Sequence, residues 1–177
     1  NAAGIKDVTI VCSTFQKKYI ESFFFPTKEK RASFDKHRPT SPFLNHVYEQ
    51  YGDILKNLNI HLAEQEDPKG LGHAVWCAKD TLGLKEGEAF ALLLPDDIML
   101  SKISQGVLEQ LNAVYQSHPT ANVLSVIEVP LIEASRYGIL EGELKDGVVR
   151  ADDFVEKPSN PKSPYACVGA YILQKGI

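Results

Sequence analysis

The sequence predicts an α/β fold built on a mixed, mostly parallel sheet, and three observations lead to that prediction. Over residues 59–129, short apolar segments alternate with longer segments whose apolar side chains recur at helical spacing. Short loops join these segments, which is typical of a sheet with helices packed on its faces. After residue 137 the pattern changes, because two alternating segments flank Asp146-Gly147 and predict a β-hairpin.

Each expected element follows from its own local pattern. Strand segments are apolar and β-branched, and they are expected at residues 5–12, 59–64, 89–94, 122–129, 137–144, 148–155 and 165–173. Helices are expected at residues 14–24, about 41–51, 71–82 and 103–117. Thr14 is placed to cap the first helix, and Pro26 ends it. Residues 26–40 carry five basic side chains and predict an exposed loop or a short helical excursion. The segment AFALLL at residues 89–94 has the uninterrupted apolar character of a fully buried strand.

The composition is that of an ordinary globular protein. Apolar residues make up 44% of the 177 residues and charged residues 24%, which argues against disorder and coiled coil. The 19 basic and 23 acidic side chains give a net charge of −4, so we expect no nucleic acid and no anionic membrane as partner. Cys12, Cys77 and Cys167 are widely spaced and odd in number, so we expect buried free thiols and a cytoplasmic setting.

Two carboxylates follow the expected strand at 89–94 directly, in the sequence Leu94-Pro95-Asp96-Asp97. In open α/β sheets, ligands bind beyond the carboxyl ends of the strands, where an Asp can hold Mg²⁺ while phosphates supply other ligands. Adjacent residues on an extended chain point opposite ways, so we expect one of the two to be the ligand. The alternative is a polar loop in which Asp97 caps a following turn.

A glycine-containing loop, Gln65 to Ala74, joins an expected strand to an expected helix. Because glycine has no Cβ, backbone N–H groups in such a loop can approach a nucleotide or another anion closely. An ordinary strand-to-helix turn is the alternative. His73, taken alone, is interpreted as a structural or surface histidine.

Three further segments place polar side chains beside apolar strands: Tyr137-Gly138, Val155-Glu156-Lys157-Pro158 and Val168-Gly169-Ala170-Tyr171. A Glu can accept hydrogen bonds from two sugar hydroxyls, and a Lys can pair with a phosphate. An isolated surface ion pair between Glu156 and Lys157 is the alternative.

The order and spacing of these segments carry a family resemblance. QEDPKGLGHAVWCAKDTLG, LLLPDD, YGIL, FVEKP and VGAYIL resemble the sugar nucleotidyltransferases over essentially the whole chain. GLGHAV followed by LPDD points to the branch that acts on UTP and glucose 1-phosphate. The resemblance implies a Rossmann-like, GT-A-like three-layer sandwich. It also implies transfer of a uridylyl group from UTP to glucose 1-phosphate, with UDP-glucose and pyrophosphate as products, Mg²⁺ as cofactor and a homo-oligomer.

Position by position, the resemblance implies a nucleotide-binding pair and a metal ligand. Gln65 and Gly70 match the positions that hold the pyrimidine base, by an amide side chain and by backbone. Asp96 matches the catalytic Mg²⁺ ligand, whereas Asp97 matches a more variable neighbour.

The resemblance also implies a sugar pocket. Gly138 matches the backbone group at the sugar ring, and Glu156 matches the acceptor for sugar hydroxyls. Lys157 matches the catalytic Lys that binds the sugar phosphate. Val168 and Gly169 match residues that line the pocket.

The sequence also departs from the family pattern. The family's glycine-rich triphosphate loop would precede Asn1, and its second metal-binding Asp would follow Ile177. Residues 1–177 are therefore expected to form a single nucleotidyltransferase domain that lacks the N-terminal nucleotide loop and the C-terminal part. We expect the full-length protein to be the enzyme and the isolated chain to be inactive.

Several alternatives stay open. A GT-A-type glycosyltransferase also places an acidic pair after a buried strand and binds a nucleotide sugar through a divalent metal. A non-catalytic, sugar-nucleotide-binding subunit is a third interpretation. A Gln and a Gly can serve uracil or thymine, and Gly138 with Glu156 would suit several hexose 1-phosphates.

Overall fold

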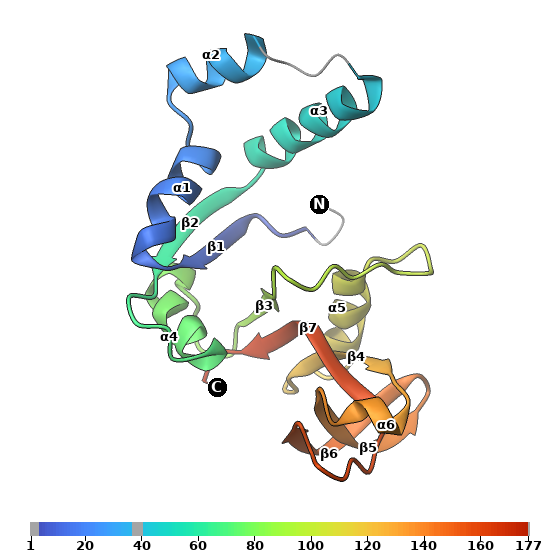
Figure 1. The fold of residues 1–177 in the computed structure, drawn as a ribbon. Coiled ribbons are helices and arrows are strands. Elements are labelled where there is room, and N and C mark those ends of the chain that lie inside the picture. Colours follow the sequence, from blue (N-terminus) through green and yellow to red (C-terminus); the bar gives the residue numbers. More distant parts are fainter. Residues whose placement is uncertain (1–3, 37–40, 177) are drawn as a thin grey trace. The chain divides into compact units, whose positions relative to one another are not determined.

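The computed structural model describes residues 4–36 and 41–176. The chain divides into two compact units, one over residues 3–84 and the other over residues 85–177 (Figure 1). Each unit has its own sheet. The single domain expected over residues 1–177 stays a prediction.

The first unit is built on two parallel strands. β1 (Asp7–Cys12) pairs with β2 (Asn59–Glu64), from Asp7 opposite Asn59 to Cys12 opposite Glu64. The helices of this unit are α1 (Thr14–Phe24), α2 (Lys28–Lys36), α3 (Pro42–Lys56) and α4 (Leu71–Leu82). α4 packs against both strands, as Figure 1 shows, and Cys12, Ala63 and Ala78 are buried there. Parallel pairing brings the carboxyl ends of both strands to one edge, where the loops into α1 and α4 begin.

The expected elements of this unit are confirmed, with three differences. Ser13, rather than Thr14, caps α1. The Ser13 hydroxyl accepts from the backbone N–H of Gln16 at 3.3 Å, and the Gln16 side-chain oxygen accepts from the backbone N–H of Ser13 at 3.2 Å. β1 begins at Asp7 rather than at residue 5. The basic segment contains a helix, α2, which confirms the second of its two expected forms, and residues 37–40 lie outside the described part. α3 continues to Lys56, five residues past the expected end at Tyr51.

The second unit is built around one long strand, β7 (Tyr165–Gln174). Both β3 (Ala89–Leu93) and β4 (Val123–Glu128) run antiparallel to β7, and they occupy opposite edges because both pair with Tyr171 and Ile172. β5 (Gly138–Lys145) pairs with the start of β7 and with β6 (Val148–Glu156). β7 therefore links the strand that precedes the two aspartates to the hairpin.

Apolar side chains from β4, β7 and one helix form the main core of the second unit. α5 (Val107–Ser117) packs on β4 and β7, and the buried residues of this core are Leu111, Val123, Ala170 and Ile172. A second core joins β5 and β7 to the short helix α6 (Leu131–Ala134), through Ala134, Ile139 and Ala166. The two cores anchor the two ends of β7.

The hairpin has the predicted turn. Asp146 and Gly147 both have positive φ, 51° and 78°, as a two-residue hairpin turn requires. The register shifts between Glu141 and Gly142, where Asp152 is the extra residue of β6. A Cβ at Gly142 would meet the carbonyl oxygen of Arg150, so this close approach of two backbones requires glycine.

The mixed α/β class and the hairpin are confirmed, but the pairing is more antiparallel than expected. Among the described strands, β1 and β2 form the parallel pair, and the other pairs are antiparallel. The reason is that β7 returns from the hairpin and inserts between β3 and β4, which themselves run in the same direction. The local sequence pattern predicts each of these strands, but it does not predict that β7 lies between β3 and β4.

Three local expectations in this unit need correction. β3 is half-buried rather than fully buried, and Leu93 is 51% exposed, since β7 is its partner among the described strands. α5 begins at Val107 instead of Ile103, because the Gly106 N–H donates to the Glu109 carboxylate at 2.6 Å and this fixes the start. The helix α6 was not expected at all.

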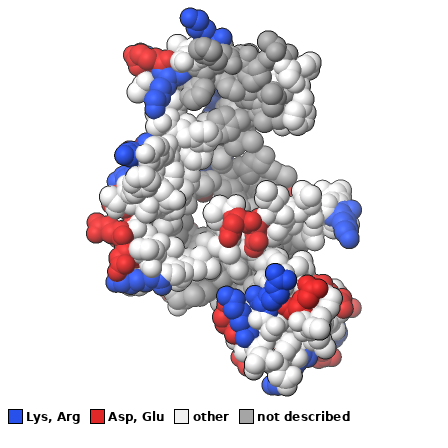
Figure 2. All heavy atoms as spheres, viewed as in Figure 1, with Lys and Arg blue, Asp and Glu red and all other residues white. Residues whose placement is uncertain are grey.

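Three features of the structure concern the expected partners and cellular setting: the lengths of its apolar helices, the distribution of its charges and the state of its cysteines. In the part of the chain that the structure describes, no helix is both long and apolar enough to span a bilayer. Figure 2 shows basic and acidic side chains interspersed over the visible face. The three cysteines are free thiols, with Cys12 buried and Cys77 and Cys167 half-buried. A cytoplasmic setting and a homo-oligomer stay predictions.

Candidate functional site

The predicted site residues fall into two groups, one in each unit. Gln65 and Gly70 belong to the first unit, at the carboxyl end of β2 and the start of α4. The second unit holds the other predicted residues, which are Asp96, Gly138, Glu156, Lys157, Val168 and Gly169.

The edge of the small parallel sheet holds the first group. The Gln65 N–H donates to the Cys12 carbonyl at 2.9 Å, which extends the pairing of β1 and β2 by one residue. Beside it, the Glu64 carboxylate accepts from the Thr14 hydroxyl at 3.1 Å and lies 3.2 Å from the Lys17 ammonium. Proximity to Glu64 raises the pKa of Lys17. This polar edge is the place where ligands bind in open α/β sheets.

Gly70 turns the chain into α4. Its φ of 97° lies in the region that only glycine adopts readily, and its carbonyl accepts from the Ala74 N–H at 3.1 Å to begin the helix. Nothing lies within 4 Å of the position that a Cβ would take there, so the backbone conformation is what demands glycine.

The Gln65 side chain is held in place by its own loop. Gln65 Nε2 lies 3.3 Å from the Gly70 carbonyl oxygen and 2.9 Å from His73 Nδ1. The other ring nitrogen of His73 lies 3.8 Å from Cys77 Sγ, one helical turn further on. The sequence interpretation of His73 was a structural or surface histidine, and this contact agrees with a structural one but was not itself predicted. Its signal is the spacing, because residue 73 lies in the first turn of α4 and so faces the loop that leads into the helix.

In the second unit, Asp97 is tied to β7. Its carboxylate accepts from the Gly169 N–H at 2.7 Å, and the Gly169 carbonyl accepts from the Leu94 N–H at 2.8 Å. A Cβ on Gly169 would lie 2.5 Å from Asp97 Oδ2 and 2.9 Å from the Leu94 Cβ. Gly169 is therefore required for the close approach of β7 to the segment that follows β3.

Asp96 stands in contrast to its neighbour. It is exposed, and within the described residues its carboxylate has no hydrogen-bond or ion-pair partner. Mg²⁺ prefers hard oxygen ligands and is often bound through one or two carboxylates together with substrate phosphates. The chemistry of Asp96 fits this mode of binding. In the described ranges, no three His, Cys, Asp or Glu side chains form a metal site by themselves.

The hairpin brings Gly138, Glu156 and Lys157 together. Gly138 lies opposite Glu156 in the register of β5 and β6, and a Cβ on Gly138 would lie 3.0 Å from Glu156 Oε2. Lys157 has a φ of 45°, and its N–H donates to the Tyr137 carbonyl at 3.0 Å. Its ammonium lies 3.4 Å from Glu156 Oε1, and both side chains are about two-thirds exposed (64% and 63%). A non-glycine residue at positive φ is uncommon, and this one stands directly after the end of β6.

Tyr171 and Cys167 link the hairpin to the aspartate segment. Burial raises the pKa of the Tyr171 hydroxyl to about 12, and the neighbouring Cys167, Asp97 and Glu156 add to the shift. Burial also raises the pKa of the Cys167 thiol, and Glu156 contributes. The strand β7, which carries the tyrosine and the cysteine, pairs with β5 and bonds to Asp97 through Gly169, so it joins the hairpin to the aspartate segment. The sequence did not mark Tyr171 or Cys167 as site residues.

A bulge in β7 presents Val168 and Gly169. One residue of β4, Ser125, lies opposite three residues of β7, between the pairs Leu124–Tyr171 and Val126–Cys167. The Ser125 Oγ lies 2.9 Å from the carbonyl oxygens of both Val168 and Ala170 and accepts from the Ala170 N–H at 3.3 Å. The hydroxyl has one hydrogen, which it donates to one of the two carbonyls at a time, while its oxygen accepts from the Ala170 N–H that the bulge leaves without a strand partner.

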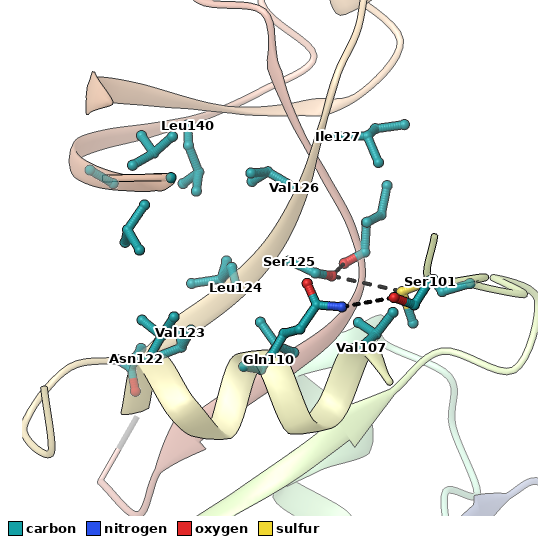
Figure 3. Close-up of a pocket in the computed structure, with 18 of the residues that line it drawn as sticks. Ser101, Val107, Gln110, Asn122, Val123, Leu124, Ser125, Val126, Ile127 and Leu140 are labelled. Carbon is teal, nitrogen blue, oxygen red and sulfur yellow. Dashed lines mark hydrogen bonds between the residues drawn. The ribbon is translucent and has the colours of Figure 1, made fainter. Parts of the chain in front are cut away.

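A cavity of the second unit adjoins this bulge. It has a volume of about 1050 Å³ and lies between α5, β4 and the turn of the hairpin (Figure 3). Its lining is mainly apolar, with the Gln110 side chain donating to the Ser101 hydroxyl at 3.0 Å. Asp97 and Val168 border it, whereas Gly138, Glu156 and Lys157 are not part of its lining. The cavity therefore shares Val168 with the predicted sugar pocket but does not include the polar residues of that pocket, Glu156 and Lys157.

Comparisons with known proteins bear on this arrangement. The model of a family described as nucleotidyl transferase matches residues 1–177. A relative named UTP–glucose-1-phosphate uridylyltransferase, from Bacillus subtilis (strain 168), is 34% identical over 99% of this chain and 57% of its own length. A protein of the same name from Staphylococcus epidermidis is 36% identical, over 99% of this chain and 58% of its own length.

The fold is also similar to those of solved structures. An apo UDP-glucose pyrophosphorylase matches with a TM-score of 0.80 and 30% identity, over 97% of this chain and 60% of that one. A UDP-glucose pyrophosphorylase complexed with UDP-glucose matches with a TM-score of 0.76 and 29% identity, over 97% and 59%. The chain thus spans less than two thirds of the length of these relatives and structures.

Proposed function

The chain belongs to the nucleotidyl transferase family, and we propose that the full-length protein transfers the uridylyl group of UTP to glucose 1-phosphate. The products are UDP-glucose and pyrophosphate. Relatives of 34–36% identity carry the name of this activity, and a structure of similar fold holds UDP-glucose.

One observation supports the proposal most strongly. In the second unit, the segment with the two aspartates is bonded to β7 through Gly169, and β7 pairs with β5, in which Gly138 lies opposite Glu156 of β6. The segment that carries Asp96 and the hairpin that carries Glu156 and Lys157 are therefore both attached to the same strand, β7. The two carboxylates and the ammonium of these residues are the groups that a sugar phosphate and a metal-bound triphosphate need.

Each residue then has a role in binding. Gln65 and the backbone at Gly70 hold the uracil base. Glu156 accepts hydrogen bonds from hydroxyls of the sugar, whose ring lies against Gly138, Val168 and Gly169. Lys157 exchanges its exposed ion pair with Glu156 for the phosphate of the sugar phosphate, a doubly charged partner.

The reaction needs positioning and neutralisation of charge more than covalent chemistry. An oxygen of the sugar phosphate forms a bond to the α-phosphorus of UTP, while the bond from that phosphorus to the bridging oxygen breaks and pyrophosphate leaves. The attacking oxygen is already ionised at pH 7, so no general base is required. Lys157 holds this phosphate against its repulsion by the α-phosphate. Mg²⁺ held by Asp96, when bound, supplies Lewis-acid neutralisation of phosphate charge.

The test is an assay of pyrophosphate release on the full-length protein. UTP, dTTP and CTP are each paired with a panel of hexose 1-phosphates in the presence of Mg²⁺. We expect UTP with glucose 1-phosphate to be the preferred pair. Transfer of a sugar from UDP-glucose to an acceptor, without pyrophosphate release from UTP, would instead favour a glycosyltransferase. Nucleotide binding without either reaction would favour a non-catalytic subunit.

A further inference from the structure

We propose that His73 is a positioning residue that selects the nucleobase, because it fixes which end of the Gln65 amide is presented to a ligand. The proposal rests on the proposed function, in which Gln65 faces the base. It concerns one loop and one helix of the first unit, from Gln65 to Cys77.

The Gly70 carbonyl determines the orientation of the amide. A side-chain amide has a donor end and an acceptor end, and a carbonyl oxygen can only accept. The Gln65 nitrogen lies 3.3 Å from the Gly70 oxygen, so one of its hydrogens is donated there. A rotated amide would bring two acceptor oxygens together.

His73 completes the arrangement as an acceptor. The second hydrogen of the Gln65 nitrogen points to His73 Nδ1 at 2.9 Å, so this ring nitrogen carries the lone pair. The neutral ring then has its hydrogen on Nε2, where Cys77 Sγ at 3.8 Å is a weak acceptor. One assignment of hydrogens therefore satisfies all four groups, which are the Gly70 carbonyl, the Gln65 amide, the His73 ring and the Cys77 thiol.

The consequence is a defined acceptor on Gln65. Both amide hydrogens of Gln65 are donated within the loop, so its oxygen Oε1 is the group left to contact a ligand. Among the described residues, no donor is bonded to Oε1. An acceptor here recognises a base edge that offers a ring N–H. Uracil and thymine have an imide N–H at ring position 3, whereas cytosine has a lone pair there. The inferred substrate class is therefore nucleotides with an imide-type base.

Without His73, the amide would be held by the longer contact to Gly70 alone. A single neutral hydrogen bond contributes about a five- to tenfold factor in an equilibrium constant. Removal of His73 should therefore weaken UTP binding by about this factor and leave CTP binding nearly unchanged. The ratio of the two constants is informative because the fraction of active protein cancels in it.

The experiment measures dissociation constants of UTP and CTP by calorimetry on the full-length protein, together with pyrophosphate release. The variants are His73→Leu, which removes the acceptor, and His73→Asn, whose Oδ1 can take the place of Nδ1. Gln65→Leu tests the base contact itself. His61→Leu is the matched control, because His61 is a half-exposed histidine of the same unit whose ring lies 3.7 Å from Asp7.

We expect His73→Leu to lower the preference for UTP over CTP about five- to tenfold. His73→Asn should restore most of it, and kcat should change less than twofold in both variants. An unchanged preference in His73→Leu, with a lost preference in Gln65→Leu, would overturn the role of His73 and keep the proposed function. An unchanged preference in Gln65→Leu would overturn both the role of His73 and the base contact. If no nucleotide releases pyrophosphate, the proposed function fails, and the binding ratio still decides on His73.

Discussion

The two groups of site residues are held in place by different means. In the first unit, Gln65, Gly70 and His73 lie within nine consecutive residues, and side chains fix one another through the loop into α4. In the second unit, Asp97 and Gly169 are 72 residues apart in sequence, and a side chain is fixed by the backbone of a distant strand. The first arrangement depends on side-chain chemistry, and the second depends on how closely β7 approaches the end of β3.

This difference has consequences for mutation. Substitutions in the loop of the first unit should change what is bound with little cost in stability. Substitutions where β7 meets the aspartate segment should change stability and activity together. Asp96 is the exception in the second unit, because it is exposed and makes no contact that holds the fold among the described residues.

The largest effect is expected for Asp96→Asn. Loss of the charge that would hold Mg²⁺ removes several kcal/mol of transition-state stabilisation, which corresponds to a roughly 10³-fold fall in kcat for pyrophosphate release. The melting temperature should change little, since the side chain is exposed. The exposed Asp152→Asn serves as a control that keeps full activity. Near wild-type, Mg²⁺-dependent turnover of Asp96→Asn would contradict the assignment.

Next in size is a pair of glycine substitutions that compares the two units directly. Gly169→Ala places a Cβ 2.5 Å from Asp97 Oδ2 and 2.9 Å from Leu94 Cβ, so the free energy of unfolding should fall by about 1–3 kcal/mol. Gly72→Ala has nothing within 4 Å and lies in the first turn of α4, so it should be neutral or stabilise by up to about 1 kcal/mol. Urea denaturation of both variants measures the difference, and equal destabilisation would contradict it.

A smaller effect is expected from Tyr171. Its pKa is raised from 10.0 to about 12 in the folded protein, so the folded state keeps a proton that the unfolded state loses over this range. The contribution of Tyr171 to stability is therefore complete below pH 10 and declines as the pH rises towards 12. Tyr171→Phe should lose less stability than the wild type between pH 9 and 12. Parallel pH profiles in urea denaturation would show that the shift is absent.

Much of the fold follows from local sequence patterns. The bounds of β2 and α4 were predicted residue for residue, because an apolar strand, a glycine-containing loop and a helical repeat follow one another there. The hairpin turn was predicted from Asp146-Gly147, whose positive φ angles have a clear sequence signature. The position of β7 between β3 and β4, antiparallel to both, was not predicted. Which strands become neighbours depends on long-range pairing, and a local sequence pattern does not contain this information.

The candidate site divides in the same way. Every predicted site residue lies in a contiguous motif, and Gly138 and Glu156 prove to be opposite each other in the hairpin register. The roles of Asp97, Ser125 and Tyr171 were missed, because each depends on a partner more than 40 residues away along the chain or on burial. The contact of His73 was not predicted for a different reason, since one histidine has many ordinary structural uses.

The most direct test of the account is to separate the two binding functions kinetically in the full-length protein. Lys157→Ala removes a charged partner for phosphate, worth about 1.5–3 kcal/mol, and should raise KM for glucose 1-phosphate roughly 10- to 100-fold. Lys162→Ala, which removes an exposed lysine 3.4 Å from Glu141, is the control. Gln65→Leu should raise KM for UTP instead. We predict that each variant changes mainly its own KM in the pyrophosphate-release assay. An unchanged KM for glucose 1-phosphate in Lys157→Ala, or changes in the same KM for both variants, would contradict the account.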